Sequence, residues 1–275
     1  MQRSFRRSVL RVAFLAALWT LPLPAAAERS FYRSVETYAS AVEFCRRAVK
    51  RPMTVDLDRR VLCFDGEISR DLDFSPLGKL SPTGTFVVRS RGGDPYLAME
   101  LADFLRKWQV TVVVYDYCMS ACASYLLVAG DETYVTRDTV VAWHHTTAPL
   151  CAVLQDALDF GPRRLEKVAC PEAAPEYGAA LLRRKQLEQT FFASRVIDPL
   201  FEDPPQSIPI RRILKSMFEQ TATYPDVLWT WNPRYSALAF KTKITYEAYP
   251  GSQDEVDALM ARHGYGSRRV VLYDP

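Results

Sequence analysis

Short runs of β-branched and aromatic residues alternate along the chain with segments of helical periodicity. Residues 54–68 (TVDLDRRVLCFDGEI) predict two strands around a turn, and residues 85–90 (TFVVRS) predict a further strand. The run 110–115 (VTVVVY) is apolar almost throughout, which is typical of a strand buried on both faces. Residues 132–135 and 139–143 are again strand-like. These runs predict a sheet in the first half of the chain.

Helical patterns separate these strands. Asp94 is a good N-cap and Pro95 suits the first position of a helix over residues 96–108. One face of that helix repeats apolar residues at helical spacing: Leu97, Leu101, Leu105 and Trp108. A second apolar, helix-capable segment covers residues 121–129. The order of strands and helices implies right-handed β-α-β crossovers, and therefore an α/β fold with a mostly parallel sheet.

The pattern changes after residue 147. Residues 148–177 contain Cys151, Cys170 and several prolines without a clear period, so we expect a loop excursion. Residues 178–275 are expected to form a helical C-terminal part of the same domain, with helices near 181–201, 210–220 and 252–264. Ser252 and Glu255 form a capping box at the start of the last helix, which should end near Gly264. The segment 227–235 (VLWTWNPRY) is aromatic and turn-rich.

The first 27 residues have the pattern of a secretory signal peptide. Four arginines precede a short apolar stretch, and Ala25-Ala26-Ala27 offers a cleavage site. An uncleaved anchor is the alternative, although the stretch is shorter than the roughly 20 residues that span a bilayer. We therefore expect cleavage near Ala27, a periplasmic or secreted protein, and a core domain over 28–147 without a membrane span.

Charge and composition narrow the possible partners. Removal of the leader takes the formal net charge from +3 to −1, because the leader holds four arginines and no acid. The arginine pairs of the remaining chain are scattered, so we expect no nucleic-acid partner. The chain has three histidines and no CxxC spacing, so we expect no metal and no cofactor.

Six cysteines in an exported chain favour disulfides, for which 15 connectivities exist. Local pairing is the simplest: Cys45–Cys63, Cys118–Cys122 and Cys151–Cys170. The CxxxC spacing of Cys118 and Cys122 favours a structural bridge over redox chemistry, which usually uses CxxC. Such a bridge would fix the turn that holds Ser120.

Three motifs in this order resemble the Clp protease/crotonase superfamily, and more closely the exported Clp-protease-like proteins of bacteria. VVRSRGGD, which ends at Asp94, resembles the glycine turn of the oxyanion hole. CMSACASYLLVAG (118–130) resembles the turn and helix of the nucleophilic serine, and VVAWHH (140–145) resembles the strand end of the catalytic histidine. The resemblance covers roughly residues 55–145 and implies a β-α-β superhelix. Such folds often assemble as rings, so a homo-oligomer is possible by analogy.

The resemblance implies Ser120 as nucleophile, His144 as base, and the amides of Gly92 and Gly93 as oxyanion donors. Asp226 fits the place of the third triad member, with Asp198 behind it. When Gly130 is aligned with the end of the helix in the family, Ala121 and not Ser120 takes the position of the nucleophilic serine. Ser120 as nucleophile therefore requires a one-residue shift in the turn.

The chemistry of these residue types suits acyl transfer. A serine hydroxyl needs a base, a histidine supplies it near neutral pH, and a glycine turn can present backbone amides to an oxyanion. We therefore expect a serine hydrolase, peptidase-like, that acts on a peptide or another acyl substrate. The alternative is a non-catalytic Clp-like binding module of the cell envelope. His145 is expected to be solvated and His263 to cap a helix.

Overall fold

The computed structural model describes residues 35–48, 52–143, 175–196, 227–266 and 269–273. All of them belong to one compact unit, residues 35–275. No helix within these ranges is long and apolar enough to cross a membrane. The signal peptide expected at 1–27 lies outside the described residues.

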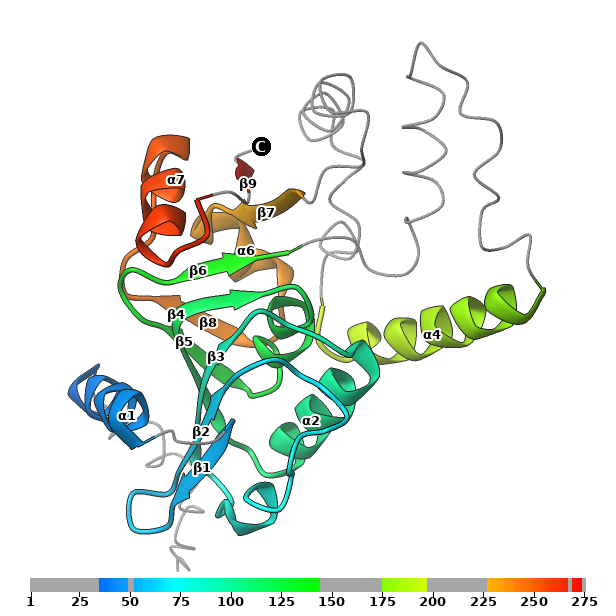
Figure 1. Cartoon of the computed structure of the whole chain (residues 1–275), viewed down its shortest axis with the longest axis horizontal. Helices are drawn as coiled ribbons and strands as arrows, with labels where there is room; N and C mark the ends of the chain where they lie inside the picture. Colours follow the sequence, from blue (N-terminus) through cyan, green and yellow to red (C-terminus); the bar gives the residue numbers. More distant parts are fainter. Residues whose placement is uncertain (1–34, 49–51, 144–174, 197–226, 267–268, 274–275) are drawn as a thin grey trace, which may run out of the picture. The chain divides into compact units, whose positions relative to one another are not determined.

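A mostly parallel sheet organises this unit, as the sequence predicts (Figure 1). Its strands are β1 (Met53–Asp56), β2 (Val61–Asp65), β3 (Thr85–Ser90), β4 (Thr111–Met119), β5 (Glu132–Val135), β6 (Val140–Ala142) and β8 (Lys243–Tyr246). The order is β1-β2-β3-β4-β5-β8, and β6 also pairs with β4. The β1–β2 pair is antiparallel and the other pairs are parallel. The two-strand prediction for 54–68 and the strand at 85–90 are thereby confirmed.

Alternating side chains of the central strands pack in two separate hydrophobic clusters. Val112 and Val114 of β4 pack in the cluster that includes helix α2 (Pro95–Lys107). Val113 and Tyr115 pack in the cluster that includes helix α1 (Val35–Ala48). Because successive side chains of a strand point to opposite faces, α1 and α2 cover opposite faces of the sheet, as Figure 1 shows.

The start of α2 is as predicted. The Asp94 carboxylate accepts hydrogen bonds from the Tyr96 and Leu97 amides, and Pro95 occupies the first helical position. This N-cap fixes where the chain turns from the glycine pair into the helix.

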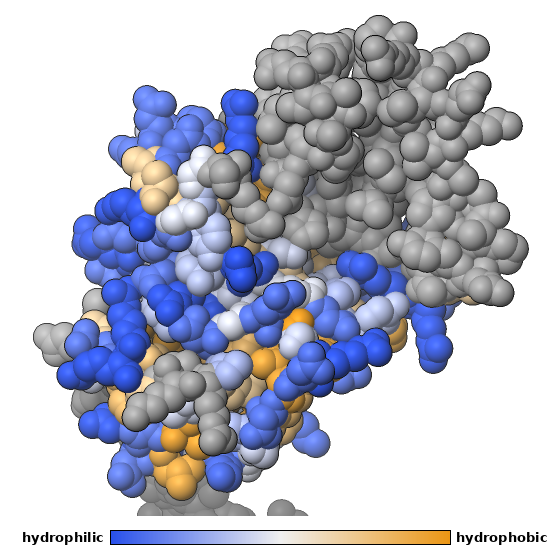
Figure 2. All heavy atoms as spheres, in the orientation of Figure 1, coloured by the Kyte–Doolittle hydropathy of each residue, from blue (hydrophilic) through white to orange (hydrophobic). Residues whose placement is uncertain are grey.

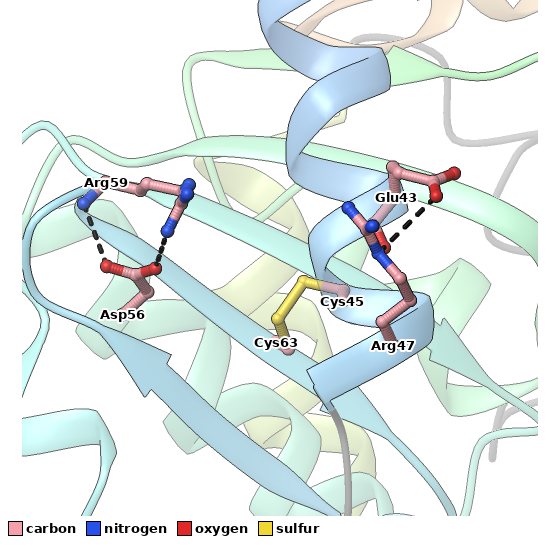
Figure 3. The surroundings of a disulfide bond; sticks show 6 residues. All are labelled: Glu43, Cys45, Arg47, Asp56, Arg59 and Cys63. Carbon is pink, nitrogen blue, oxygen red and sulfur yellow. Dashed lines mark hydrogen bonds and ion pairs between the residues drawn. A yellow bond between two sulfur atoms is a disulfide. The ribbon is translucent and has the colours of Figure 1, made fainter.

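A disulfide joins helix α1 to strand β2. Cys45 and Cys63 are both fully buried, with their Cα atoms 5.4 Å apart (Figure 3). Exposed ion pairs flank the bridge, Glu43–Arg47 on the helix and Asp56–Arg59 at the β1–β2 turn. The predicted pairing is confirmed. Together with the Cys118–Cys122 bridge described below, it indicates that the protein works in an oxidising environment outside the cytosol.

The C-terminal part corrects our expectation of a helical region. Its described residues include three strands: β7 (Val227–Trp231), β8 and β9 (Arg269–Tyr273). Each is a short β-branched or aromatic run whose partner is distant in sequence. Lys243 of β8 pairs with Glu132 of β5, and β7 pairs with β9 in a separate two-stranded sheet. Local periodicity does not reveal such long-range pairing.

The helices of this part follow the sequence more closely. They are α4 (Pro175–Ala193), α6 (Pro233–Ala239) and α7 (Gln253–Arg262). The predicted N-cap of α7 is confirmed, because the Ser252 hydroxyl accepts from the Glu255 amide. The Glu255 carboxylate accepts from the Gly251 amide, one residue before the N-cap amide that a capping box uses. The helix expected near 181–201 begins earlier, at Pro175, while the helix expected at 210–220 lies outside the described residues.

The described surface is mostly hydrophilic in the view of Figure 2, with small and separated apolar patches. The large apolar side chains that are exposed on the described residues are Leu57, Leu182 and Leu187. Isolated apolar residues of this kind are ordinary on a protein surface.

Candidate functional site

Ser120 occupies a strained turn at the end of β4. Its φ is 56°, in the left-handed region that costs a residue with a Cβ roughly 1–2 kcal/mol. The helical conformation begins at the next residue, Ala121, and continues as one turn of π-helix, Cys122–Leu126. This turn replaces the longer helix expected over 121–129. A serine on a strained strand-to-helix turn has the backbone geometry of a nucleophile elbow.

Two backbone hydrogen bonds hold Ser120 in this conformation. Its amide donates to the Ala142 carbonyl over 2.8 Å, and its carbonyl accepts from the Ser124 amide over 2.9 Å. The first bond ties the turn to the end of β6, and the second ties it to the following helix. Ser120 therefore lies in the turn and not within the helix.

The glycine turn predicted for the oxyanion hole is in direct contact with Ser120. Gly92 and Gly93 have φ values of 96° and 137°, which side chains rarely adopt. A Cβ on Gly92 would lie 2.7 Å from Ser120 Cβ and 2.8 Å from Ala121 N. Two turns that are 28 positions apart in the sequence thus pack without room for a methyl group between them.

The amides of the glycine pair differ in their surroundings. The Gly92 amide donates to the Ser90 hydroxyl over 3.1 Å, and Ser90 is buried. No acceptor for the Gly93 amide lies among the described residues. A Cβ on Gly93 would lie 2.1 Å from the Ile68 carbonyl oxygen, so only glycine fits there. Of the two predicted donors, Gly93 is the one that keeps its N–H available in this part of the chain.

A bulge in β4 determines where its last residues lie. Val88 of β3 pairs with Val114, but Ser90 pairs with Cys118, so β4 uses three residues where β3 uses one, Arg89. Before the bulge β4 pairs with β5, and after it β4 pairs with β6. The bulge therefore turns the end of β4, and with it Ser120, toward β6.

Arg89 holds this bulge electrostatically. Its guanidinium bonds both oxygens of Asp65 and reaches Asp116 in the bulge over 2.8 Å. These half-buried carboxylates raise the pKa of Arg89 above its ordinary value, with the Asp65 hydrogen bond as the main cause. Asp116 also pairs with Arg46 of α1 and has a φ of 57°. Burial raises the pKa of the neighbouring Tyr115 to about 12.

A second disulfide encloses the serine turn. Cys118 and Cys122 have their Cα atoms 5.2 Å apart and are both fully buried. The predicted pairing of these two cysteines is confirmed. The bridge joins the end of β4 to the first turn of the helix, with Ser120 midway between its ends.

The other predicted site residues lie outside the described residues: His144, Asp226, Asp198, Cys151 and Cys170. The structure does describe the chain next to two of them. Trp143, which precedes His144, exchanges both backbone hydrogen bonds with Trp229 of β7, each over 2.8 Å. Asp226 immediately precedes β7 in the sequence. The described segments before His144 and after Asp226 are therefore paired with each other.

Sequence reasoning missed Ser90 and the Arg89 bulge as parts of this region. A serine two residues before a glycine is a signal for a side-chain turn, but β3 gives no other hint of it. Arg89 and Asp116 are charged residues within β-rich runs, where a partly buried ion pair is an exception that the sequence pattern can reveal.

Two further features lie apart from this site. His263 ends α7, and its Nε2 lies 2.8 Å from the Asp138 carbonyl oxygen, consistent with the capping position expected for it. A cavity of about 290 Å³ lies beside α7, and its rim carries Arg137 and Arg262. Both arginines are already ion-paired, with Glu247 and Asp138 respectively. No group of three or more metal-ligating side chains occurs among the described residues.

Comparisons with known proteins add no relative to this picture. No protein-family model matches the chain, and no curated protein matches it.

Proposed function

We propose that this protein is an exported serine hydrolase, peptidase-like, with Ser120 as its nucleophile. His144 is the general base, and a carboxylate, Asp226 by preference, orients the imidazole. The glycine turn at Gly92 and Gly93 supplies backbone donors for the oxyanion. The substrate is a peptide or another acyl compound.

One observation carries the proposal: Gly92 is packed against a serine in the left-handed conformation. Strained backbone at a non-glycine residue persists only where surrounding contacts fix it, and it is concentrated at functional sites. Here the strained serine turn packs directly on a glycine turn that leaves no room for a side chain. A structural turn needs neither feature, since a glycine at position 120 would adopt the same φ at lower cost.

The proposed chemistry follows from this placement. His144 takes the proton of the Ser120 hydroxyl as the oxygen attacks the acyl carbon, and it later gives a proton to the leaving group. Water then hydrolyses the acyl-enzyme by the reverse proton transfers. A backbone donor of the glycine turn, the Gly93 amide by preference, stabilises the developing oxyanion.

The neighbourhood of β6 supports His144 as the base. The Ala142 carbonyl accepts from the Ser120 amide, and His144 follows only two residues later. Two residues of chain span at most about 7 Å, so the imidazole has a short distance to cover. The proposal requires it to come within roughly 2.6–3.2 Å of the hydroxyl in a competent state.

The test is steady-state hydrolysis of activated acyl esters and of a mixed peptide pool by the exported full chain. Ser120→Ala and His144→Ala are each expected to lower kcat/KM at least about a thousandfold. The double variant should be no worse than either single variant, because the two groups act as one unit. Ser124→Ala, in the π-helical turn that follows Ser120, is the matched control. Hydrolysis that survives Ser120→Ala would refute Ser120 as the nucleophile, and absence of hydrolysis by the wild-type protein would favour the non-catalytic binding module.

A further inference from the structure

We propose that formation of the Cys118–Cys122 disulfide switches the Ser120 site on, so that the protein is inactive before export and active after it. This inference rests on the proposed function. It assigns to the bridge a regulatory role at the site, beyond stabilisation of the fold.

The position of Cys118 is fixed independently of the bridge. It pairs with Ser90 on one side and with Val141 on the other, so it lies in the middle of three parallel strands. It is also fully buried. Cys118 therefore provides a rigid anchor at the end of β4, two residues before Ser120.

Cys122 is also fully buried, but it is not part of a strand, and the bridge is its covalent link to the end of β4. Cys122 begins a single π-helical turn, a rare form of helix that occurs mostly as single turns. The two bridged Cα atoms are 5.2 Å apart, within the range that a disulfide permits, and the three residues between them form a tight turn. Ser120, at the centre of that turn, carries the positive φ.

Without the bridge, two backbone hydrogen bonds and the contact with Gly92 remain to oppose relaxation of the turn. The left-handed conformation of a non-glycine residue is disfavoured by an amount that corresponds to roughly tenfold or more in population. Relaxation of Ser120 to a negative φ would move its side chain away from the glycine turn, against which Gly92 leaves no spare room. The competent arrangement then becomes a minor state, and the apparent rate falls by the same factor.

Because both sulfurs are buried, the disulfide forms once and is not reduced again in the folded protein. Neither Cys118 nor Cys122 exposes any surface, so a reductant cannot reach the bond in the folded protein. The bond must form while the chain folds. In the reducing cytosol the two thiols persist, and in an oxidising compartment they are oxidised.

The redox step is ordinary thiol–disulfide exchange with an exported dithiol oxidant. The Sγ–Sγ bond between Cys118 and Cys122 forms as the oxidant's own disulfide breaks. The oxidant takes up the two electrons and the two protons and leaves as a dithiol.

The second disulfide offers a matched control. Cys45–Cys63 is equally buried, but it joins α1 to β2 and lies away from Ser120 in the sequence and in the sheet order. The experiment compares the wild-type full chain with Cys118→Ala/Cys122→Ala and Cys45→Ala/Cys63→Ala. The measured quantities are the rate of fluorophosphonate labelling of Ser120, the cooperativity of thermal unfolding, and amide hydrogen exchange over residues 119–124.

The switch predicts about tenfold or slower labelling in the Cys118/Cys122 variant, with cooperative unfolding retained and exchange over 119–124 accelerated. The Cys45/Cys63 variant should label at the wild-type rate while it remains folded. Mild reductant added to folded wild-type protein should leave labelling unchanged. Equal labelling of the two double variants would overturn the inference.

If the Cys118/Cys122 variant fails to fold, wild-type protein refolded with its thiols reduced decides the matter. Folded but unlabelled protein that regains labelling on oxidation supports the switch. Reduced protein that labels normally overturns the inference, because the bridge is then dispensable for the site. Reduced protein that does not fold also overturns it, because the bridge then stabilises the whole fold and not the site alone. Absence of Ser120-dependent labelling in every sample refutes the proposed function and with it the switch, while the exchange data still report whether the bridge holds the turn.

Discussion

Replacement of Gly92 by alanine should be unusually damaging for so small a change. The added Cβ would lie 2.7 Å from Ser120 Cβ and 2.8 Å from both Ala121 N and the Met119 carbonyl oxygen. Two of these neighbours are backbone atoms, which cannot rotate away. The φ of 96° is unfavourable for alanine whatever the space.

Two other glycines separate the conformational cost of the Gly92→Ala substitution from its overpacking cost. Gly264 has a φ of 80° and nothing within 4 Å of its added Cβ, so Gly264→Ala incurs only the conformational cost, roughly 1–2 kcal/mol. Gly78 has neither a positive φ nor a close neighbour, so Gly78→Ala should be neutral or stabilising by roughly 0.4–1 kcal/mol. Gly92→Ala adds overpacking of roughly 1–3 kcal/mol to the conformational cost. Its total destabilisation is therefore about 2–5 kcal/mol.

Urea unfolding measures the three variants directly, because buried tryptophans such as Trp229 report the transition by fluorescence. The expected order of the free energy of unfolding is Gly78→Ala, then Gly264→Ala, then Gly92→Ala as the least stable. Gly92→Ala should also abolish Ser120 labelling in the fraction that remains folded. A Gly92→Ala variant as stable as Gly264→Ala would refute the close packing of the glycine turn on the serine turn.

Three further predictions concern Ser120, Tyr115 and the first disulfide. Because φ at Ser120 is positive, Ser120→Gly should be more stable to urea than Ser120→Ala by about 1 kcal/mol, and the usual order, with alanine favoured, would contradict this. The Tyr115 hydroxyl is buried without a hydrogen-bond partner among the described residues, so Tyr115→Phe should not destabilise the protein at neutral pH. Burial raises the Tyr115 pKa to about 12, so stability that is full below pH 10 falls as the pH rises toward 12, and Tyr115→Phe should flatten that fall in pH-dependent melts. Loss of the Cys45–Cys63 bridge, which closes a separation of 18 residues, should lower the free energy of unfolding by roughly 2–4 kcal/mol, and an unchanged urea midpoint would argue against it.

Local signals in the sequence were sufficient for the first half of the fold. The β-branched run at 110–115 and the Asp94-Pro95 pair each act through their immediate neighbours, and the structure places a strand and a helix start there. The local cysteine pairs 45–63 and 118–122 were also predictable, because short separations bring both partners together within one supersecondary unit.

The strands of the second half of the fold could not be predicted from the sequence, because they depend on pairing between distant segments. β8 joins the sheet beside β5, and β7 pairs with β9, although neither run has a local partner that would mark it as a strand. The π-helical turn after Ser120 was not predictable either, since no local pattern distinguishes it from an α-helix and it packs against a glycine turn that is distant in sequence. For the candidate site, the sequence predicted candidate residues but not their backbone geometry. The positive φ of Ser120 and the occupied amide of Gly92 emerge only from the packing of two turns.

The identity of the residue that attacks an acyl group is the central claim, and covalent labelling tests it most directly. The oxidised full chain is treated with a fluorophosphonate, and the adduct is counted by intact mass and located by peptide mapping. We predict one phosphonyl group per chain, on Ser120, that is lost in Ser120→Ala and retained in Ser124→Ala. An adduct on another residue, or no adduct on the oxidised protein, would contradict the account.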